Sequence, residues 1–169
     1  MPPESISFRP AAKDDYEFLR RVYASTREDE MALVPWTDEE KSAFLEQQFR
    51  AQDEHYHRVY DNTDYLIIVR DGIDIGRLYI DRLPDEIHLL DIALLKEFRR
   101  GGIGAALLKD ILEEGRATNR KVTIYVEHFN PARHLYDRLG FQHVDTNGVY
   151  HLMEWRADAP AATPAKRGQ

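Results

Sequence analysis

The chain has 169 residues, of which 43% are hydrophobic and 31% are charged, and this composition is typical of a globular protein with one domain-sized core. Its formal net charge of −7 argues against nonspecific nucleic-acid binding, and the absence of cysteine excludes disulfides, thiolate metal sites and a cysteine nucleophile. The sequence contains neither the ~18-residue apolar run that a membrane span needs nor a signal-peptide pattern, so we expect a cytoplasmic protein that does not bind membranes.

The first sixty residues predict one strand and two helices. Residues 5–9 alternate in polarity, as a half-buried strand does, and Pro10 is expected to end that strand. Each helix start is marked by two polar residues three positions apart, which are Asp14 with Glu17 and Thr37 with Glu40. The charged run 27–30 is expected to lead into a loop that ends at Trp36, and the second helix runs on toward Tyr60.

The remaining residues predict six strands and two helices. In chain order they are strands 65–69, 73–80 and 89–95, a helix over 103–115, strand 122–126, a short helix after Pro131, and strands 141–144 and 149–155. Asp71-Gly72 and Asn147-Gly148 are two-residue hairpin signals. The order predicts an α+β fold, a mixed central β-sheet flanked by helices, in a single domain of residues 1–156. Residues 157–169 are unpatterned and predict a disordered tail.

The stretch 89–108 places a glycine-rich turn between a buried strand and a helix. Such a turn aims unpaired helix N–H groups at an anion, and Arg99 and Arg100 add positive charge beside it. The dinucleotide pattern G-x-G-x-x-G fails because Leu107 stands where the third glycine belongs, and the Walker pattern fails because no Gly-Lys pair occurs. The stretch predicts a phosphate-binding loop of another type, and a glycine turn without a ligand is the alternative.

Two motifs resemble those of one known family. Arg99, Gly102 and Gly104 form R-x-x-G-x-G, which resembles the pyrophosphate-binding loop of the GCN5-related N-acetyltransferases, the GNAT family, which bind acetyl-CoA. A second stretch resembles the family's other motif through Asn130, Ala132, Leu135, Tyr136, Gly140 and Phe141. The resemblance covers about residues 5–156. It implies the GNAT fold and an acetyl-CoA-dependent N-acetyltransferase that transfers acetyl to a primary amine by direct attack in a ternary complex.

The resemblance also implies how the cosubstrate is held. The strand before the loop and the next strand along the chain would run parallel and splay apart, and the pantetheine arm would lie between them. The implied acetyl-CoA-binding residues are Ile92, Ala93, Leu94, Arg99, Arg100, Gly101, Gly102, Ile103, Gly104, Asn130 and Arg133. We expect no metal, since the histidines have no metal-binding spacing.

Acetyl transfer from a thioester to an amine needs a base, an oxyanion donor and an acid for the leaving thiolate. The resemblance places Tyr136 near the sulfur as that acid, and packing in the core is its alternative role. The family's strand glutamate is replaced here by Leu90. His88 and Asp91 are therefore equal candidates for the base, and Glu86, Glu127 or water are further ones.

The acceptor is not determined beyond a small-molecule or peptide amine. The acidic run 28–30 lies in the region that lines the acceptor cleft in GNAT folds, where it would attract a cationic amine, and a solvated loop is the alternative. The oligomeric state is left open between a monomer and a homodimer. The missing glutamate supports a second hypothesis, a CoA-binding sensor or interaction module without significant catalysis.

Overall fold

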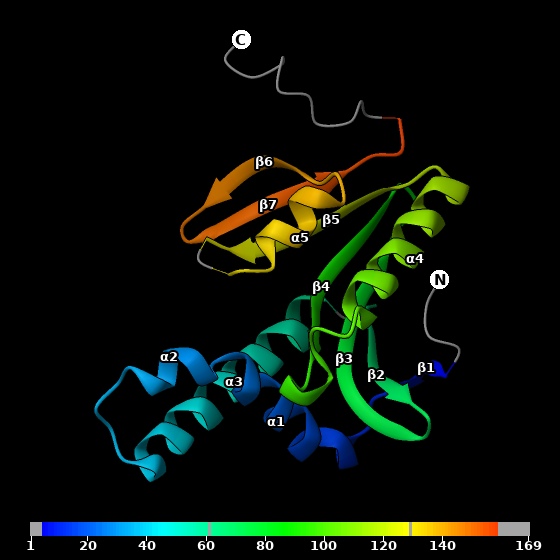
Figure 1. Cartoon of the computed structure of the whole chain (residues 1–169). Helices are drawn as coiled ribbons and strands as arrows, with labels where there is room; N and C mark the ends of the chain where they lie inside the picture. The colour runs from blue at the N-terminus through cyan, green and yellow to red at the C-terminus, as the bar shows by residue number, and fades with distance from the viewer. Residues whose placement is uncertain (1–4, 61, 129, 159–169) are drawn as a thin grey trace. The chain divides into compact units, whose positions relative to one another are not determined.

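The computed structural model describes residues 5–60, 62–128 and 130–158. Seven strands form one mixed sheet in the hydrogen-bonded order β1-β2-β3-β4-β5-β7-β6 (Figure 1). The strands are β1 Ile6–Pro10, β2 Asp64–Arg70, β3 Ile73–Arg82, β4 Glu86–Leu94, β5 Lys121–Glu127, β6 Gln142–Asn147 and β7 Tyr150–Trp155. The helices are α1 Tyr16–Thr26, α2 Glu28–Ala32, α3 Asp38–Val59, α4 Ile103–Thr118 and α5 Arg133–Arg138. The mixed sheet and its helices confirm the predicted α+β class.

The chain divides into two compact units. In the described chain, the N-terminal unit consists of residues 5–79 and Asp91–Gly104, and the C-terminal unit of Ile80–Leu90 and residues 105–158. Strands β3 and β4 and helix α4 each begin in one unit and end in the other. The single domain expected for residues 1–156 stays a prediction.

In the N-terminal unit, Pro10 ends the first strand, as the sequence predicted. β1 pairs antiparallel with β2 from Ile6↔Arg70 to Pro10↔Leu66, so the proline is the last residue of the strand itself. β1 stands at the edge of the sheet order, where a residue without an N–H group is tolerated.

The first helix begins at Tyr16, two residues after the expected cap residue Asp14. A 3₁₀ turn over Lys13–Asp15 precedes α1. The side chain that accepts a hydrogen bond from the backbone there is that of Asp15 and not that of Asp14. The Asp15 carboxylate accepts from the Ala12 N–H at 2.8 Å and from the Arg9 guanidinium at 2.8 Å. The Arg9 hydrogen bond holds the pKa of Asp15 below its usual value, since it stabilises the ionised form.

Residues 27–32 also differ from the prediction, because Glu28–Ala32 forms the short helix α2 instead of a loop. Its first turn carries three carboxylates, which favourably oppose the partial positive charge of a helix start. The capping box of α3 is confirmed: the Glu40 N–H donates to Thr37 Oγ1 at 3.1 Å, and the Thr37 N–H donates to Glu40 Oε1 at 2.9 Å. The apolar faces of α1, α3 and β2 meet in one core cluster made of Leu19, Tyr23, Leu45, Phe49 and Ile67.

At Gly76 the backbone of β3 approaches the end of β4 very closely. A Cβ atom added at Gly76 would lie 2.3 Å from the Ala93 carbonyl oxygen and 2.9 Å from Leu94 Cδ2. The Leu95 N–H donates to the Ile75 carbonyl at 2.8 Å in the same region. Only glycine permits this approach, so Gly76 determines where the backbone of residues 93–95 lies within the N-terminal unit.

In the C-terminal unit, β4 pairs in parallel with β5 from Glu86↔Lys121 to Leu89↔Ile124, which confirms the expected parallel pair. β7 pairs antiparallel with both β5 and β6, which confirms the predicted hairpin, and Gly148 and Val149 form the turn between the paired residues Asn147 and Tyr150. One face of the β4–β5 pair is apolar and buried, with Ile87, Leu89, Val122 and Ile124. By alternation the opposite face carries Glu86, His88, Thr123 and Tyr125.

The strand ends extend beyond the apolar runs that predicted them. β3 continues to Arg82 and β4 begins at Glu86, three residues before the apolar run, because backbone pairing continues through polar residues. Of the expected tail, residues 157–158 form a turn and residues 159–169 lie outside the described residues. No helix in the described part of the chain has the length and apolar character to cross a membrane.

Candidate active site

The predicted phosphate loop lies in the N-terminal unit at the start of α4. The helix begins at Ile103, so the preceding glycines stand at its N-terminus, as the sequence indicated. Arg100 and Gly102 have φ angles of 66° and 85°, in the left-handed region that favours glycine. A Cβ atom added at Gly101, Gly102 or Gly104 would meet no atom within 4 Å. The loop therefore presents bare backbone at a helix N-terminus, which is where an anion binds favourably.

Arg99, the first residue of the motif, is held by two neutral acceptors. Its Nε donates to the Leu94 carbonyl at 2.9 Å, and its Nη2 donates to Ser25 Oγ at 3.0 Å. These bonds connect the end of β4, helix α1 and the loop within one unit. Arg99 has a structural role there and also keeps its positive charge beside the glycines.

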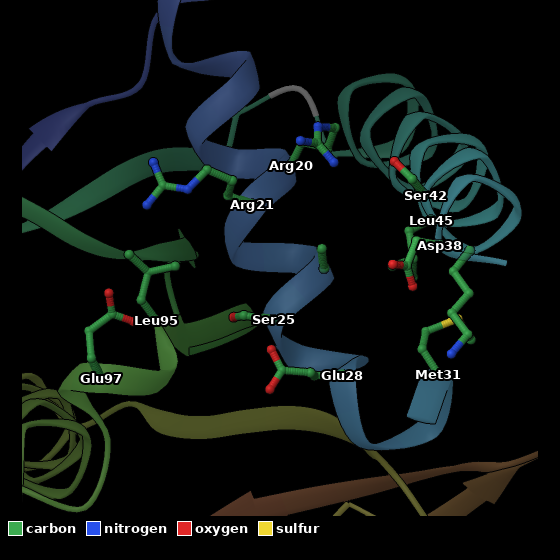
Figure 2. A pocket seen from close by; sticks show the side chains of 12 residues that line it. Arg20, Arg21, Ser25, Glu28, Met31, Asp38, Ser42, Leu45, Leu95 and Glu97 are labelled. Atoms are coloured by element: carbon green, nitrogen blue, oxygen red, sulfur yellow. The ribbon is translucent and has the colours of Figure 1, made fainter. Parts of the chain in front are cut away.

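An open pocket of about 520 Å³ lies in the same unit (Figure 2). Arg20 and Arg21 come from α1, and Leu95 and Glu97 follow β4, whereas Asp38, Lys41, Ser42 and Leu45 come from α3. The pocket is therefore lined by cationic, carboxylate and apolar side chains together. The acidic run contributes Glu28, whose carboxylate pairs with Lys96 Nζ at 2.8 Å, and this hydrogen bond lowers the pKa of Glu28.

In the C-terminal unit, candidate base His88 belongs to a hydrogen-bonded group. Its Nδ1 lies 2.8 Å from Thr123 Oγ1, and the Thr123 hydroxyl donates to Glu86 Oε2. The ring of Tyr125 meets the imidazole edge to face, with 5.8 Å between centroids. Burial lowers the pKa of His88, and the carboxylates of Glu86 and Asp81 oppose that shift.

Candidate base Asp91 lies in the N-terminal unit and pairs with Arg77, whose side chain is 2% exposed. Gln52 Oε1 accepts from Arg77 Nη2 at 3.0 Å, and the guanidinium lies 4.8 Å from the ring centroid of Tyr79. Burial lowers the pKa of Arg77, but the charge of Asp91 opposes this, and the net direction is upward. The Asp91 carboxylate therefore neutralises a buried cation.

The second motif surrounds α5 in the C-terminal unit. Asn130 Oδ1 accepts from the Ala132 N–H at 2.9 Å, a hydrogen bond that stabilises the turn before α5. Tyr136 is buried on α5, and its ring packs against Phe141 with centroids 5.5 Å apart. Arg133 Nη1 donates to the His128 carbonyl at 2.7 Å, while Arg133 Nε is buried and has no hydrogen-bond partner in the part of the chain that the structure describes.

Sequence reasoning missed Thr123, Gln52 and Ser25. Each is an ordinary polar residue whose hydrogen-bond partner is distant in the chain. The one signal that could have found Thr123 is the β4–β5 register, which places it opposite His88. Within the described ranges, no three His, Asp or Glu side chains are grouped so as to hold a metal ion.

Two curated relatives are similar to this chain. A putative [ribosomal protein bS18]-alanine N-acetyltransferase of Bacillus subtilis is 28% identical over 115 residues, covering 62% of this chain and 76% of the relative. An N-alpha-acetyltransferase of Sulfurisphaera tokodaii is 37% identical over 85 residues, covering 47% of this chain and 51% of the relative. The match therefore spans about half the length of the second relative.

The fold is also found among solved structures, including PaiA N-acetyltransferase from Thermoplasma acidophilum in complex with coenzyme A. That structure has a TM-score of 0.66 and 19% sequence identity, covering 90% of this chain and 99% of the other. The family model described as the acetyltransferase (GNAT) family matches residues 16–141. Since this match includes the phosphate loop, the β4–β5 pair and the second motif, the chain belongs to the acetyltransferase (GNAT) family.

Proposed function

We propose that the chain transfers the acetyl group of acetyl-CoA to a primary amine by direct attack in a ternary complex. The observation that carries the proposal is the bare glycine loop at the start of α4 in a chain of this family. The similar PaiA fold was crystallised with coenzyme A. Direct attack is supported by the absence of cysteine, which removes the most reactive covalent carrier.

Two groups of residues are proposed to hold the cosubstrate. In the N-terminal unit they are the backbone of Ile92, Ala93 and Leu94, which would also supply the oxyanion donor, and the loop Arg99, Arg100, Gly101, Gly102, Ile103 and Gly104. In the C-terminal unit they are Asn130 and Arg133. The support is the open space beside the glycines of the loop, its two arginines, and the unsatisfied buried Nε of Arg133.

Replacing Gly104 by Ala tests the loop without damaging the fold. The added methyl group meets no atom within 4 Å, and alanine favours a helix over glycine by up to about 1 kcal/mol, so the free energy of unfolding should not fall. The same methyl group would obstruct a phosphate on the backbone, and we expect the Kd for CoA to rise about 10-fold or more. Calorimetric titration and urea unfolding measure the two effects.

Gly115→Ala is the matched control, because it is the same change in the same helix. Its Cβ atom would lie 2.8 Å from the Arg120 carbonyl oxygen, so overpacking should cost about 1–3 kcal/mol. The CoA affinity of the folded variant should stay at the wild-type value. An unchanged Kd in Gly104→Ala would refute the loop assignment.

We propose the α-amino group of a polypeptide N-terminus as the acceptor. Both curated relatives are named for acetylation of such groups, a ribosomal-protein alanine in one and an N-alpha-amine in the other. The open pocket of the N-terminal unit offers Glu97 for a cationic amine and Leu95 and Met31 for an apolar side chain. The N-terminus of a polypeptide can supply both a cationic amine and an apolar side chain.

The reaction requires defined proton movements. A base takes one proton from the ammonium group, and the neutral nitrogen then bonds to the acetyl carbon while the carbon–sulfur bond breaks. Tyr136 is proposed to give its hydroxyl proton to the departing sulfur and to regain one from the amide nitrogen. His88 is favoured as the base over Asp91, because protonating Asp91 would leave the buried Arg77 charge without a partner. Overall, one proton leaves to solvent.

The test is an assay of free thiol release from acetyl-CoA, with mass spectrometry of the acceptor. The acceptors are peptides with free N-termini, the same peptides with blocked N-termini and an internal lysine, and a polyamine. We expect release only with a free N-terminus, whose pKa of about 8 also makes it easier to deprotonate than lysine. Release with lysine or the polyamine alone would overturn the acceptor assignment. Tight CoA binding with no release from any amine would instead support the sensor alternative.

A further inference from the structure

Three side chains on the β4–β5 pair form a continuous hydrogen-bonded chain within the C-terminal unit. The imidazole of His88 contacts the hydroxyl of Thr123 at 2.8 Å, and that hydroxyl contacts the carboxylate of Glu86. His88 and Thr123 are directly opposite in the parallel register, and Glu86 lies two residues earlier on the same face of β4. The arrangement is therefore built on two paired strands and not on a loop.

The chemistry of the three groups determines where the protons lie. An ionised carboxylate only accepts, so the single hydroxyl proton of Thr123 is directed to Glu86. The Thr123 oxygen is then the acceptor for His88, and Nδ1 of the imidazole must carry the hydrogen. A neutral imidazole has one N–H group, so its lone pair is on Nε2. Thr123 is 3% exposed, so water competes poorly for this hydroxyl.

We propose that Thr123 and Glu86 are positioning residues that hold His88 in the tautomer whose Nε2 accepts the proton of the acceptor's ammonium group. This inference rests on the proposed function and adds to it the residues that orient the base. The proton moves from the ammonium nitrogen to Nε2, and the resulting imidazolium keeps its Nδ1–H bond to Thr123. Deprotonation by solvent then restores the starting state.

The groups around His88 set the direction of its pH response. Asp81 on β3 and Glu86 on β4 favour the imidazolium, whereas burial disfavours it more strongly, so the pKa of His88 lies below its usual value. On the β5 side, Tyr125 contacts the ring, and Lys121 on the same face is paired with Glu154 of β7 at 3.6 Å. Glu86→Gln removes one of the two carboxylates that favour protonation. The acid limb of its kcat/KM profile should therefore move to lower pH than in the wild type.

The decisive measurement is the nitrogen-15 NMR spectrum of the histidine side chains in the full-length protein. We expect His88 to carry its proton on Nδ1 in the wild type at neutral pH, and Thr123→Val to give a mixture of tautomers. We expect the kcat of Thr123→Val to fall at least about 10-fold, with Thr123→Ser restoring both the tautomer and the rate. Thr63→Val is the matched control, because Thr63 is also buried and its Oγ1 has no hydrogen-bond partner in the described chain.

The outcomes separate this inference from the proposed function. A proton on Nε2 of His88 in the wild type, or a tautomer unchanged by Thr123→Val, would overturn the inference whatever the activity. A Thr123→Val enzyme with wild-type kcat and pH profile would overturn it as well. If the tautomers behave as expected but no amine yields free thiol, the tautomer of His88 is still set by Thr123 and Glu86, whereas its role as the base and the proposed transferase function both fail.

Discussion

Replacing Tyr136 by phenylalanine is expected to lower kcat by about 100-fold to 10,000-fold, the range typical of a lost general acid. The departing sulfur would leave as a thiolate without the proton that the hydroxyl supplies. The aromatic ring, which packs against Phe141 with centroids 5.5 Å apart, is unchanged in size. The CoA affinity and the fold should therefore stay close to those of the wild type.

Thiol release at saturating acetyl-CoA and acceptor measures the rate, and calorimetry measures the affinity. Tyr23→Phe is the matched control, because Tyr23 and Tyr136 are both helical and both 5% exposed. The control should retain the wild-type kcat. A Tyr136→Phe enzyme with wild-type turnover would show that this tyrosine only packs the core, which is the alternative role that its burial also permits.

Replacing Asp91 by asparagine is expected to lower the free energy of unfolding by about 3 kcal/mol or more, as when one partner of a buried ion pair is lost. The change keeps the side-chain size but leaves the guanidinium of Arg77, which is 2% exposed, without a counter-charge. Gln52 and Tyr79, which also contact the guanidinium, carry no negative charge to replace that of Asp91. Arg77 Nη1 has no hydrogen-bond partner among the described residues even before the change. The described neighbours of Arg77 therefore offer little to compensate for the lost charge of Asp91.

Urea unfolding of the folded variants gives the comparison. Asp74→Asn is the control, because Asp74 pairs with Arg9 at 2.8 Å but both side chains are about one-third or more exposed. A solvent-exposed pair is worth about 0–1 kcal/mol, so this variant should be nearly as stable as the wild type. The double change Arg77→Met with Asp91→Leu should recover most of the lost stability. Equal losses of unfolding free energy in Asp91→Asn and Asp74→Asn would contradict the argument that burial makes the Asp91–Arg77 pair the more important one for stability.

The Asp91→Asn variant also distinguishes the two candidate bases, His88 and Asp91. If His88 is the base, a folded Asp91→Asn enzyme should keep a kcat within a few-fold of the wild type, whereas His88→Gln should lose about 100-fold or more. The two residues were equal candidates in the sequence because strand alternation alone describes a face and not the partners on it. The partner of Asp91 is 14 positions away and the partner of His88 is 35 positions away.

Features that depend on a few neighbouring residues were predictable. The capping box of Thr37 and Glu40 is closed by two hydrogen bonds between residues three positions apart. The start of α4 after its glycines and the β6–β7 hairpin also agree with the local sequence, whereas the parallel β4–β5 pair was expected only from the family resemblance. The prediction was wrong for the charged run 28–30, which forms a short helix instead of a loop.

The sequence by itself determined the α+β class, the order of the elements apart from α2, and the position of the loop, because these depend on local hydrogen bonds and on the period of apolar residues. Only the tertiary structure decided that Asp91 neutralises Arg77 and that Thr123 joins Glu86 to His88. A side-chain contact between strands depends on their register, and a shift of one residue would turn each side chain to the other face. That register is set by the packing of the whole sheet and leaves no local pattern in the chain.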